Sequence, residues 1–415
     1  MNCSFSTNGR GEELLTGTKW LIVLPNLNLG GAQRQALLLT DELQQRGGRV
    51  TLVVTDVTRL RGSVFLPPGG IRTSLARQHC SPPLKLFMLI GLMLSSMVLR
   101  TAGLGGYRGR LRLLISSSMR AWVVGRLRWL SNSPESGPER AFIESFPGAI
   151  FAVNGLQRLV EKESPDIVLS FLPKTSLITI VALQAEKVGR PVLAVSERND
   201  VCRQGLGRDI ERAREELYEH ADFVFANSRH AVDDLKKMSK KPNAQWLPNR
   251  DLPDVVREAS SANSRVIAVV GRLVPSKRVD KALHAFSKSC LPGAGWRMRI
   301  FGDGPERGDL AKLVSTLNLN DIVDFVGLVG DWRTYSAPPA ALIIASDYEG
   351  FPNVFAEALS ASTLPLFRYS IEELRFVLDA ELFKELGFAE VDQLAGLLNR
   401  LATEPQWREK QLAAA

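Results

Sequence analysis

The sequence predicts an α/β protein in which two doubly wound, Rossmann-like domains face each other across a cleft. The first observation is size: 415 residues, 45% hydrophobic and 23% charged, are too many for one ordinary domain and can bury separate cores. The second is periodicity, because short β-rich runs alternate with helical patterns, as in parallel sheets wound with helices. The third is a segment rich in Pro, Asn and Ser at 242–264, which divides the alternating pattern in two as a linker would.

The first predicted domain covers residues 18–250. It opens with a strand, WLIVLP, followed by the loop NLNLGG and by a helix whose apolar residues recur at helical spacing until two glycines end it. We expect its strands at 20–25, 50–55, 166–172, 191–197 and 221–228, with a helix at 175–189. Sheets of this kind bind ligands at the carboxyl ends of their strands, so function is expected in the loops that follow them.

The second predicted domain covers residues 265–415. We expect strands at 265–273, 296–302, 322–327, 340–346 and 363–367, and helices at 279–288, 306–317 and 354–360. Two such domains bring the strand ends of both sheets to one cleft, and the chemistry is predicted there.

An insertion at 57–134 in the first domain concentrates the positive charge. It holds twelve Lys or Arg residues and no Asp or Glu, so it carries +12 while the rest of the chain sums to +8 minus +12, or −4. Its apolar run at 86–99, LFMLIGLMLSSMVL, is shorter than the roughly 20 residues needed to cross a bilayer. Apolar and basic residues together favour an interfacial helix, and we expect 84–130 to bind an anionic membrane surface. A buried core helix with solvated arginine neighbours is the alternative.

Cysteine spacing and the N-terminal residues bear on location. The four cysteines lie far apart without CxxC spacing, which argues against a disulfide framework or a zinc cluster. The first twenty residues hold no apolar run of signal-peptide length. We therefore expect a cytoplasmic protein that associates peripherally with the inner face of the membrane.

Two loops hold residues suited to a diphosphate. Gly30 and Gly31 lie between a strand and a helix, where backbone N–H groups can approach a phosphate at the positive end of the helix dipole. Such a turn can also be only a tight connection. Arg272 and Lys277 follow the first strand of the second domain in VVGRLVPSKRVD, where a forked guanidinium and an ammonium suit two phosphates. The alternative for this pair is a solvated turn with two exposed bases.

The segment SDYEGFPNVFAEALS combines two carboxylates with a helix start. Glu349 stands in a loop, and Glu357 follows eight positions later on the helix that this loop introduces. Pro352 suits a helix beginning, which leaves the N–H groups of Asn353 and Val354 free to hold an anion. We expect the two carboxylates beside that anion to accept hydrogen bonds from sugar hydroxyls. Two solvent-facing surface glutamates are the alternative.

No side-chain set in the sequence indicates a metal site. The four histidines are isolated, and neither HExxH nor a clustered Asp pair is present. A diphosphate held without metal needs fixed positive charge, which two cations and two helix N-termini can provide. The turn formed by Gly302, Asp303 and Gly304 ends another strand and is expected to complete the binding site, in part as a structural turn.

Together these motifs resemble the family-four retaining glycosyltransferases of the GT-B fold. The resemblance covers about 19–56 and 165–367, through GGAQ, VSERND, ADFVFANS, VVGRLVPSKRVDKALHAF and EGFPNVFAEAL. It implies a nucleotide-sugar donor, usually with UDP, no cofactor, and retention at the anomeric carbon. By this resemblance Arg272 and Lys277 hold the donor diphosphate. Glu349 contacts the transferred sugar, Glu357 binds the ribose, and the two glycines shape the cleft from the opposite domain.

The same motifs are similar to family members that extend lipopolysaccharide, capsule or lipid-linked oligosaccharides. The resemblance therefore implies transfer of a hexose or an N-acetylhexosamine to a saccharide acceptor that is lipid-linked. The basic apolar insertion agrees with such an acceptor.

Departures from the family pattern leave an alternative open. GGAE reads GGAQ, ending at Gln33, and SFLPK stands where many members carry a histidine. After Glu357 the expected Ala-Gly-x-Pro is replaced by SASTLPLF, with Ser362 in place of glycine. A catalytically inactive homologue that binds nucleotide or membrane as a scaffold is the alternative. Nucleic-acid binding is disfavoured, because few aromatic residues are interleaved with the arginines for base stacking.

Overall fold

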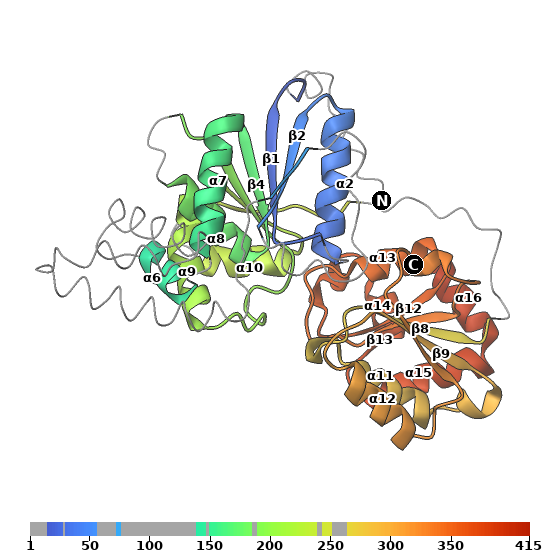
Figure 1. Ribbon diagram of the computed structural model, residues 1–415. Helices are drawn as coiled ribbons and strands as arrows, with labels where there is room; N and C mark the ends of the chain where they lie inside the picture. Colours follow the sequence, from blue (N-terminus) through green and yellow to red (C-terminus); the bar gives the residue numbers. More distant parts are fainter. Residues whose placement is uncertain are drawn as a thin grey trace, which may run out of the picture.

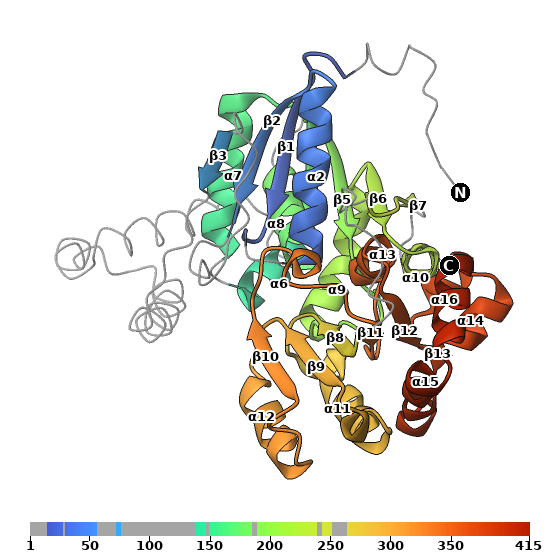
Figure 2. The same cartoon turned by 90° about the vertical axis from the view of Figure 1, so that its right-hand side faces the viewer.

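The chain forms two α/β domains in contact with each other in the computed structural model (Figures 1 and 2). The structure describes residues 15–27, 30–55, 72–75, 138–146, 149–184, 189–238, 243–250 and 264–415. Apart from 72–75, the basic insertion at 57–134 lies outside these residues, and so does the expected membrane-binding segment at 84–130.

The first domain is built on a parallel sheet of seven strands in the order β3-β2-β1-β4-β5-β6-β7. Its strands are β1 (Lys19–Leu24), β2 (Arg49–Val54), β3 (Arg72–Leu75), β4 (Ile167–Phe171), β5 (Val192–Glu197), β6 (Phe223–Ala226) and β7 (Ala244–Trp246). The order reverses between β1 and β4, and this reversal is where doubly wound sheets open a ligand-binding crevice.

Helices cover both faces of this sheet, because strand side chains alternate between the faces. Ile22 and Leu24 belong to the core on the face covered by α2 (Gly31–Gln45), whereas Leu21 and Val23 belong to the core on the other face. The core on the face opposite α2 is completed by α6 (Pro138–Ser145), α7 (Ala149–Glu163), α8 (Pro173–Leu183), α9 (Arg208–Leu217) and α10 (Arg229–Met238).

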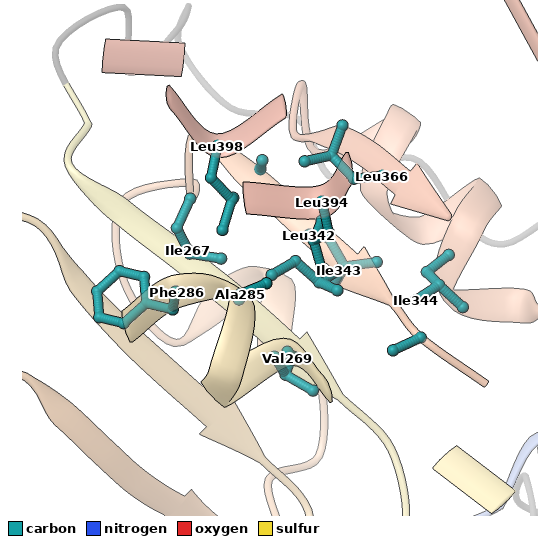
Figure 3. Close-up of a cluster of buried hydrophobic side chains, with 14 of the residues drawn as sticks. Ile267, Val269, Ala285, Phe286, Leu342, Ile343, Ile344, Leu366, Leu394 and Leu398 are labelled. Atoms are coloured by element: carbon teal, nitrogen blue, oxygen red, sulfur yellow. The ribbon is translucent and has the colours of Figure 1, made fainter. Parts of the chain in front are cut away.

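The second domain repeats the plan with six parallel strands in the order β10-β9-β8-β11-β12-β13. Its strands are β8 (Val266–Val270), β9 (Arg297–Phe301), β10 (Val323–Gly327), β11 (Ala341–Ile344), β12 (Leu364–Arg368) and β13 (Gly387–Phe388). Its helices are α11 (Val279–Lys288), α12 (Arg307–Thr316), α13 (Asn353–Ser360), α14 (Ala380–Leu386), α15 (Val391–Thr403) and α16 (Pro405–Ala414). Figure 3 shows Ile343, Phe286 and Leu398 among the side chains that form its core.

The fold brings the two strand-order reversals to one interface. Figure 1 shows α2 beginning close to α13 of the other domain. The loop after β1 leads into α2, the loop after β8 carries Arg272, and the loop after β11 carries Glu349. These are the loops in which the sequence places its candidate residues.

The predicted fold class is confirmed, and several element bounds are corrected. The strand expected at 265–273 ends at Val270, because Gly271 adopts φ +155° and starts a loop. The predicted linker at 242–264 begins with strand β7, which pairs with β6 through Ala226↔Trp246. The pattern also missed β3, β13 and the helices α14 and α16, which are short or weakly periodic. Among the described helices, none is both long and apolar enough to cross a membrane.

Candidate active site

The loop after β8 carries the two predicted diphosphate-binding cations. It runs from Gly271 through the 3-10 turn Pro275–Lys277 into α11. Arg272 is exposed on this loop, and its side chain has no ion pair with any described carboxylate within 4.0 Å. Lys277 is half-buried at the end of the turn. Of the two predicted cations, Lys277 is therefore engaged by a carboxylate, whereas Arg272 has none among the described residues.

Lys277 is engaged by the loop of the neighbouring strand. Its Nζ forms an ion pair with Oε1 of Glu349, and Ser346 Oγ donates a 2.7 Å hydrogen bond to the same oxygen. The two loops meet because β8 and β11 are adjacent parallel strands. The structure thus brings Lys277 and Glu349 together, with Ser346 fixing the carboxylate.

The beginning of α13 meets the glycine loop of the first domain. Asn353 is its first residue, after Pro352, and Val354 follows it in the first turn, where N–H groups lack helical acceptors. Asn353 Nδ2 donates to the carbonyl oxygen of Gly31 over 3.3 Å, and a Cβ added at Gly31 would lie 2.9 Å from that nitrogen. Gly31 therefore permits a close approach between the domains, whereas Gly30 faces Gln33 of its own helix.

Glu357 is buried at the domain interface beside a cation from the first domain. Arg34 Nη1 lies 3.0 Å from its Oε1, and Trp332 Nε1 donates a 2.6 Å hydrogen bond to its Oε2. Burial raises the pKa of Glu357, while Arg34, the Trp332 hydrogen bond and Arg333 oppose that rise. The carboxylate is held in a fixed position, with Arg34 bridging the two domains.

Asp331 is a second carboxylate near Arg34, at 3.7 Å from its Nη2. Burial works against ionisation of Asp331, but hydrogen bonds from Arg333 and the charges of Arg333 and Arg34 lower its pKa below the ordinary range. Arg34 therefore faces two carboxylates of the second domain.

The GDGP turn has a packing role. A Cβ at Gly302, which has φ +125°, would lie 1.9 Å from the carbonyl oxygen of Gly271, and one at Gly304 would lie 2.2 Å from that of Leu273. Leu273 N donates to the carbonyl oxygen of Asp303 at 3.0 Å. The two glycines thus let the turn lie against the loop that carries Arg272, and the exposed Asp303 caps its own turn through Gly304 N at 2.9 Å.

A polar recess too small to admit a water molecule adjoins Glu349 at the interface. Residues of both domains line it: Asp200, Ser228, His230, Glu349, Gly350, Ser370, Glu372 and Glu373. His230 comes from α10, with Nε2 3.3 Å from Asp234 and Nδ1 3.7 Å from Glu372. Although the segment SFLPK lacks a histidine, this one reaches the cleft from another element.

Sequence reasoning missed several residues of this site. Arg34 directly follows GGAQ, so helical spacing could have placed it on the exposed side of α2 near the glycine loop. Ser346 lies within the segment already singled out, and its spacing of three residues from Glu349 is the available signal. Trp332 carried no such signal, because only a tertiary contact brings it to α13.

Comparison with known families identifies the second domain. Residues 254–411 match the family model described as Glycosyl transferases group 1. The family resemblance drawn from the motifs is confirmed by this match.

Curated relatives are similar over parts of the chain. An exopolysaccharide phosphotransferase of Streptomyces coelicolor, SCO2592, is 37% identical over 134 residues, covering 31% of this chain and 14% of that protein. The lipopolysaccharide core biosynthesis glycosyltransferase LpsE of Rhizobium meliloti is 23% identical, covering 57% of this chain and 65% of that protein. An N-acetylgalactosaminyltransferase of Campylobacter jejuni that acts on a diphospho-undecaprenol-linked saccharide is 29% identical, covering 35% and 41%. The chain thus spans less than two thirds of each of these relatives.

Solved structures share the fold over nearly the whole chain. Anabaena HepE in complex with UDP and glucose superposes with a TM-score of 0.64 at 14% identity, covering 96% of this chain and 93% of that chain. WaaG, a glycosyltransferase involved in lipopolysaccharide biosynthesis, gives 0.60 at 14% identity, covering 95% and 93%. The two-domain GT-B architecture is therefore confirmed.

Proposed function

We propose that this chain, whose residues 254–411 belong to the glycosyl transferases group 1 family, moves a hexose or N-acetylhexosamine from a UDP-sugar to a lipid-linked or polysaccharide acceptor. Transfer retains the anomeric configuration and needs no metal ion. The donor binds the second domain, and the acceptor enters from the first.

The observation that carries this proposal is the ion pair between Lys277 and Glu349 beside the start of α13. Lys277 supplies positive charge for the diphosphate, while the other oxygen of Glu349 remains available to a sugar hydroxyl. The first turn of α13 adds N–H donors to the same anion. Arg272, exposed on the same loop, is free to close on a bound diphosphate.

The reaction then follows from where charge develops. The bond between the anomeric carbon and the departing diphosphate oxygen breaks through an oxocarbenium-like state, and the acceptor oxygen bonds to the same face of that carbon. The acceptor proton passes to the departing diphosphate. Lys277, Arg272 and the α13 N–H groups stabilise the negative charge that grows on the leaving group. Glu357 accepts a hydrogen bond from the ribose once Arg34 yields one carboxylate oxygen.

Replacing Lys277 with Ala tests the site. We expect UDP release in the presence of acceptor to fall by about 100- to 1,000-fold, the range seen when one preorganised electrostatic donor is removed. Glu349→Ala should lower turnover comparably while UDP binding persists, because that side chain faces the sugar. Lys288→Ala is the matched control. Lys288 is an exposed lysine at the far end of α11, and it forms an ion pair with Asp392 of α15. Unchanged turnover in both site variants would show that the assignment is wrong.

The second candidate function is a catalytically inactive scaffold, which the altered segment SASTLPLF favours. Ser362 occupies φ +52°, a left-handed conformation that glycine adopts more easily. The rest of the segment nevertheless forms β12, in register with β11 from Ala341↔Leu364 to Ile344↔Phe367. The substitution at Ser362 therefore strains the backbone locally, just before β12, and leaves the pairing of β12 with β11 intact. Calorimetric UDP binding without hydrolysis or transfer, across a panel of UDP-sugars, would instead favour the scaffold.

A further inference from the structure

Arg198 is a cation of the first domain with no anionic partner in the described part of the chain. It follows β5 directly, within VSERND, at the carboxyl end of the sheet. Its guanidinium carbon lies 5.1 Å from the centroid of the Phe171 ring. Nη1 donates to two neutral oxygens, the carbonyl of Leu247 at 3.5 Å and Oδ1 of Asn249 at 3.1 Å.

The charge of Arg198 is poorly compensated where it stands. Its Nε is buried and finds no acceptor, and no described carboxylate lies within 4.0 Å of the guanidinium. Burial and the repulsion of nearby Arg250 lower the pKa of Arg198 to about 10. A largely desolvated guanidinium without a counter-ion among the described residues is unfavourable, because two hydrogen bonds to neutral oxygens and a ring contact replace only part of its lost hydration.

Three other arginines that the first domain brings to this interface have carboxylate partners, whereas Arg198 has none among the described residues. Arg34 has Glu357 at 3.0 Å, and Arg229 has Glu373 at 3.2 Å. Arg250 itself pairs with Glu42 at 2.8 Å.

One side chain connects Arg198 to the candidate site. Asn249, which accepts from Arg198, donates through Nδ2 to the carbonyl oxygen of Phe351 at 3.2 Å and to Oδ1 of Asn353. Phe351 and Asn353 flank Pro352 at the start of α13. The uncompensated cation therefore lies on the first domain, one amide away from the place where the proposed diphosphate binds.

We propose that Arg198 binds a phosphate group of a substrate at the rim of the active site. A guanidinium carries five N–H donors in a planar fork, and the donors that Leu247 and Asn249 do not use can turn toward phosphate oxygens. The phosphate comes either from the acceptor, as the diphosphate of a lipid carrier, or from the donor. The inference rests on the proposed function for the identity of these substrates, and its position in the acceptor-side domain favours the first source.

Binding measurements on Arg198→Met test the proposal. The variant keeps an unbranched side chain over Phe171 and removes the charge and all donors. Calorimetry is run first with UDP, and then with geranyl diphosphate added to the UDP-saturated protein. We expect geranyl diphosphate affinity to fall at least tenfold with UDP affinity within twofold of the wild type. A tenfold loss for UDP instead would assign the phosphate to the donor, and unchanged affinity for both probes would overturn the proposal.

The matched control is Arg190→Met. Arg190 precedes β5 at the opposite end of the same strand and is neutralised by two hydrogen bonds to Asp222, at 2.8 and 2.7 Å. This variant should bind both probes as the wild type does. Arg198→Lys keeps a charge but loses the fork, so it should weaken the affected probe by an intermediate factor.

Thermal unfolding without ligand separates a binding role from a structural one. If Arg198 is retained for a phosphate, Arg198→Met should melt at or above the wild-type temperature, because an uncompensated charge is removed. A lower melting temperature together with wild-type affinities would overturn the proposal, as would a carboxylate elsewhere in the chain that neutralises Arg198. These titrations require no sugar transfer, so their outcome is independent of the Lys277 and Glu349 activity test.

Discussion

Individual side chains at the domain interface are arranged around two glutamates. Glu349 is bound by Lys277 and by the Ser346 hydroxyl of its own loop, whereas Glu357 is bound by Arg34 from the other domain and by Trp332. Both carboxylates are therefore fixed in place, and Glu357 is the more deeply buried, with 6% of its side chain exposed. Desolvation of Glu357 disfavours its charged form, so the binding role proposed for this residue comes with a loss of stability.

Glu357→Gln is expected to separate those two effects. The raised pKa means that protonated Glu357 stabilises the fold at low pH, and this contribution is lost as pH rises through the raised value. At pH 7 the variant should therefore be as stable as the wild type or more stable in urea unfolding. The difference should vanish as pH falls toward 4, where the wild-type carboxyl is also neutral.

The affinity of Glu357→Gln for UDP should fall, although its stability at pH 7 is equal to or higher than that of the wild type. Loss of the carboxylate that we propose binds the ribose should weaken UDP binding about tenfold, or about 1.4 kcal/mol. Glu404→Gln, at an exposed glutamate paired with Arg400, is the control for both measurements. If Glu357→Gln binds UDP with wild-type affinity, Glu357 is not part of the nucleotide site.

At the scale of elements, the site is assembled from loops that leave adjacent parallel strands. The loops after β8 and β11 meet because those strands pair, and the loop after β9 lies on the loop after β8 because two glycines leave room for it. Strand pairing thus places the loops, while close backbone contacts shape them. Arg272 and Lys277 depend on that shape.

Gly304→Ala tests the contact between the two loops. The added Cβ would lie 2.2 Å from the carbonyl oxygen of Leu273, so backbone must shift and we expect a loss of about 3 kcal/mol in the free energy of unfolding. Gly396→Ala is the control, since that glycine lies inside α15 with nothing within 4 Å of the added Cβ, and the change should stabilise the helix by about 0.5–1 kcal/mol. Equal stabilities of the two variants would contradict the packing role.

The whole molecule holds its domains together by polar contacts around the proposed cleft. Besides Arg34, the interface contains Arg229, whose backbone N–H and guanidinium both bind Glu373, at 2.6 and 3.2 Å. The same guanidinium lies 4.1 Å from the centroid of the Trp246 ring and 5.0 Å from that of Phe376, one ring from each domain. Polar interfaces of this kind between domains generally permit relative domain motion.

Membrane association is a prediction at this scale, and it concerns residues outside the described ranges. The proposed lipid-linked acceptor requires access to a bilayer surface, and the insertion at 57–134 carries +12. Changing Arg108, Arg110, Arg112 and Arg120 to Gln should reduce flotation with anionic vesicles, because each basic residue near such a surface contributes about 1 kcal/mol. A control with four exposed arginines changed elsewhere, at Arg46, Arg190, Arg212 and Arg297, should float as the wild type does. Equal flotation of all three proteins would show that these four arginines do not contribute electrostatically to membrane binding.

The sequence by itself determined the architecture and most of the candidate site. Hydrophobic periodicity is a local property, so alternating runs such as WLIVLP and RVIAVVGRL sufficed to predict two parallel sheets. Because parallel strands share one functional edge, the same reading placed Lys277 and Glu349 together. The short edge strands β7 and β13 were not predicted, because two or three residues are too few to show a periodic pattern.

Only the tertiary structure decided which partners those residues have. Arg34 and Glu357 are 323 positions apart in sequence, and Asn249 and Asn353 are 104 apart, so no local signal connects them. The same holds for Arg198, whose partners among the described residues are neutral oxygens and a ring. Burial and the presence or absence of a counter-ion are properties of the packed molecule, because they depend on what the rest of the chain brings near a side chain.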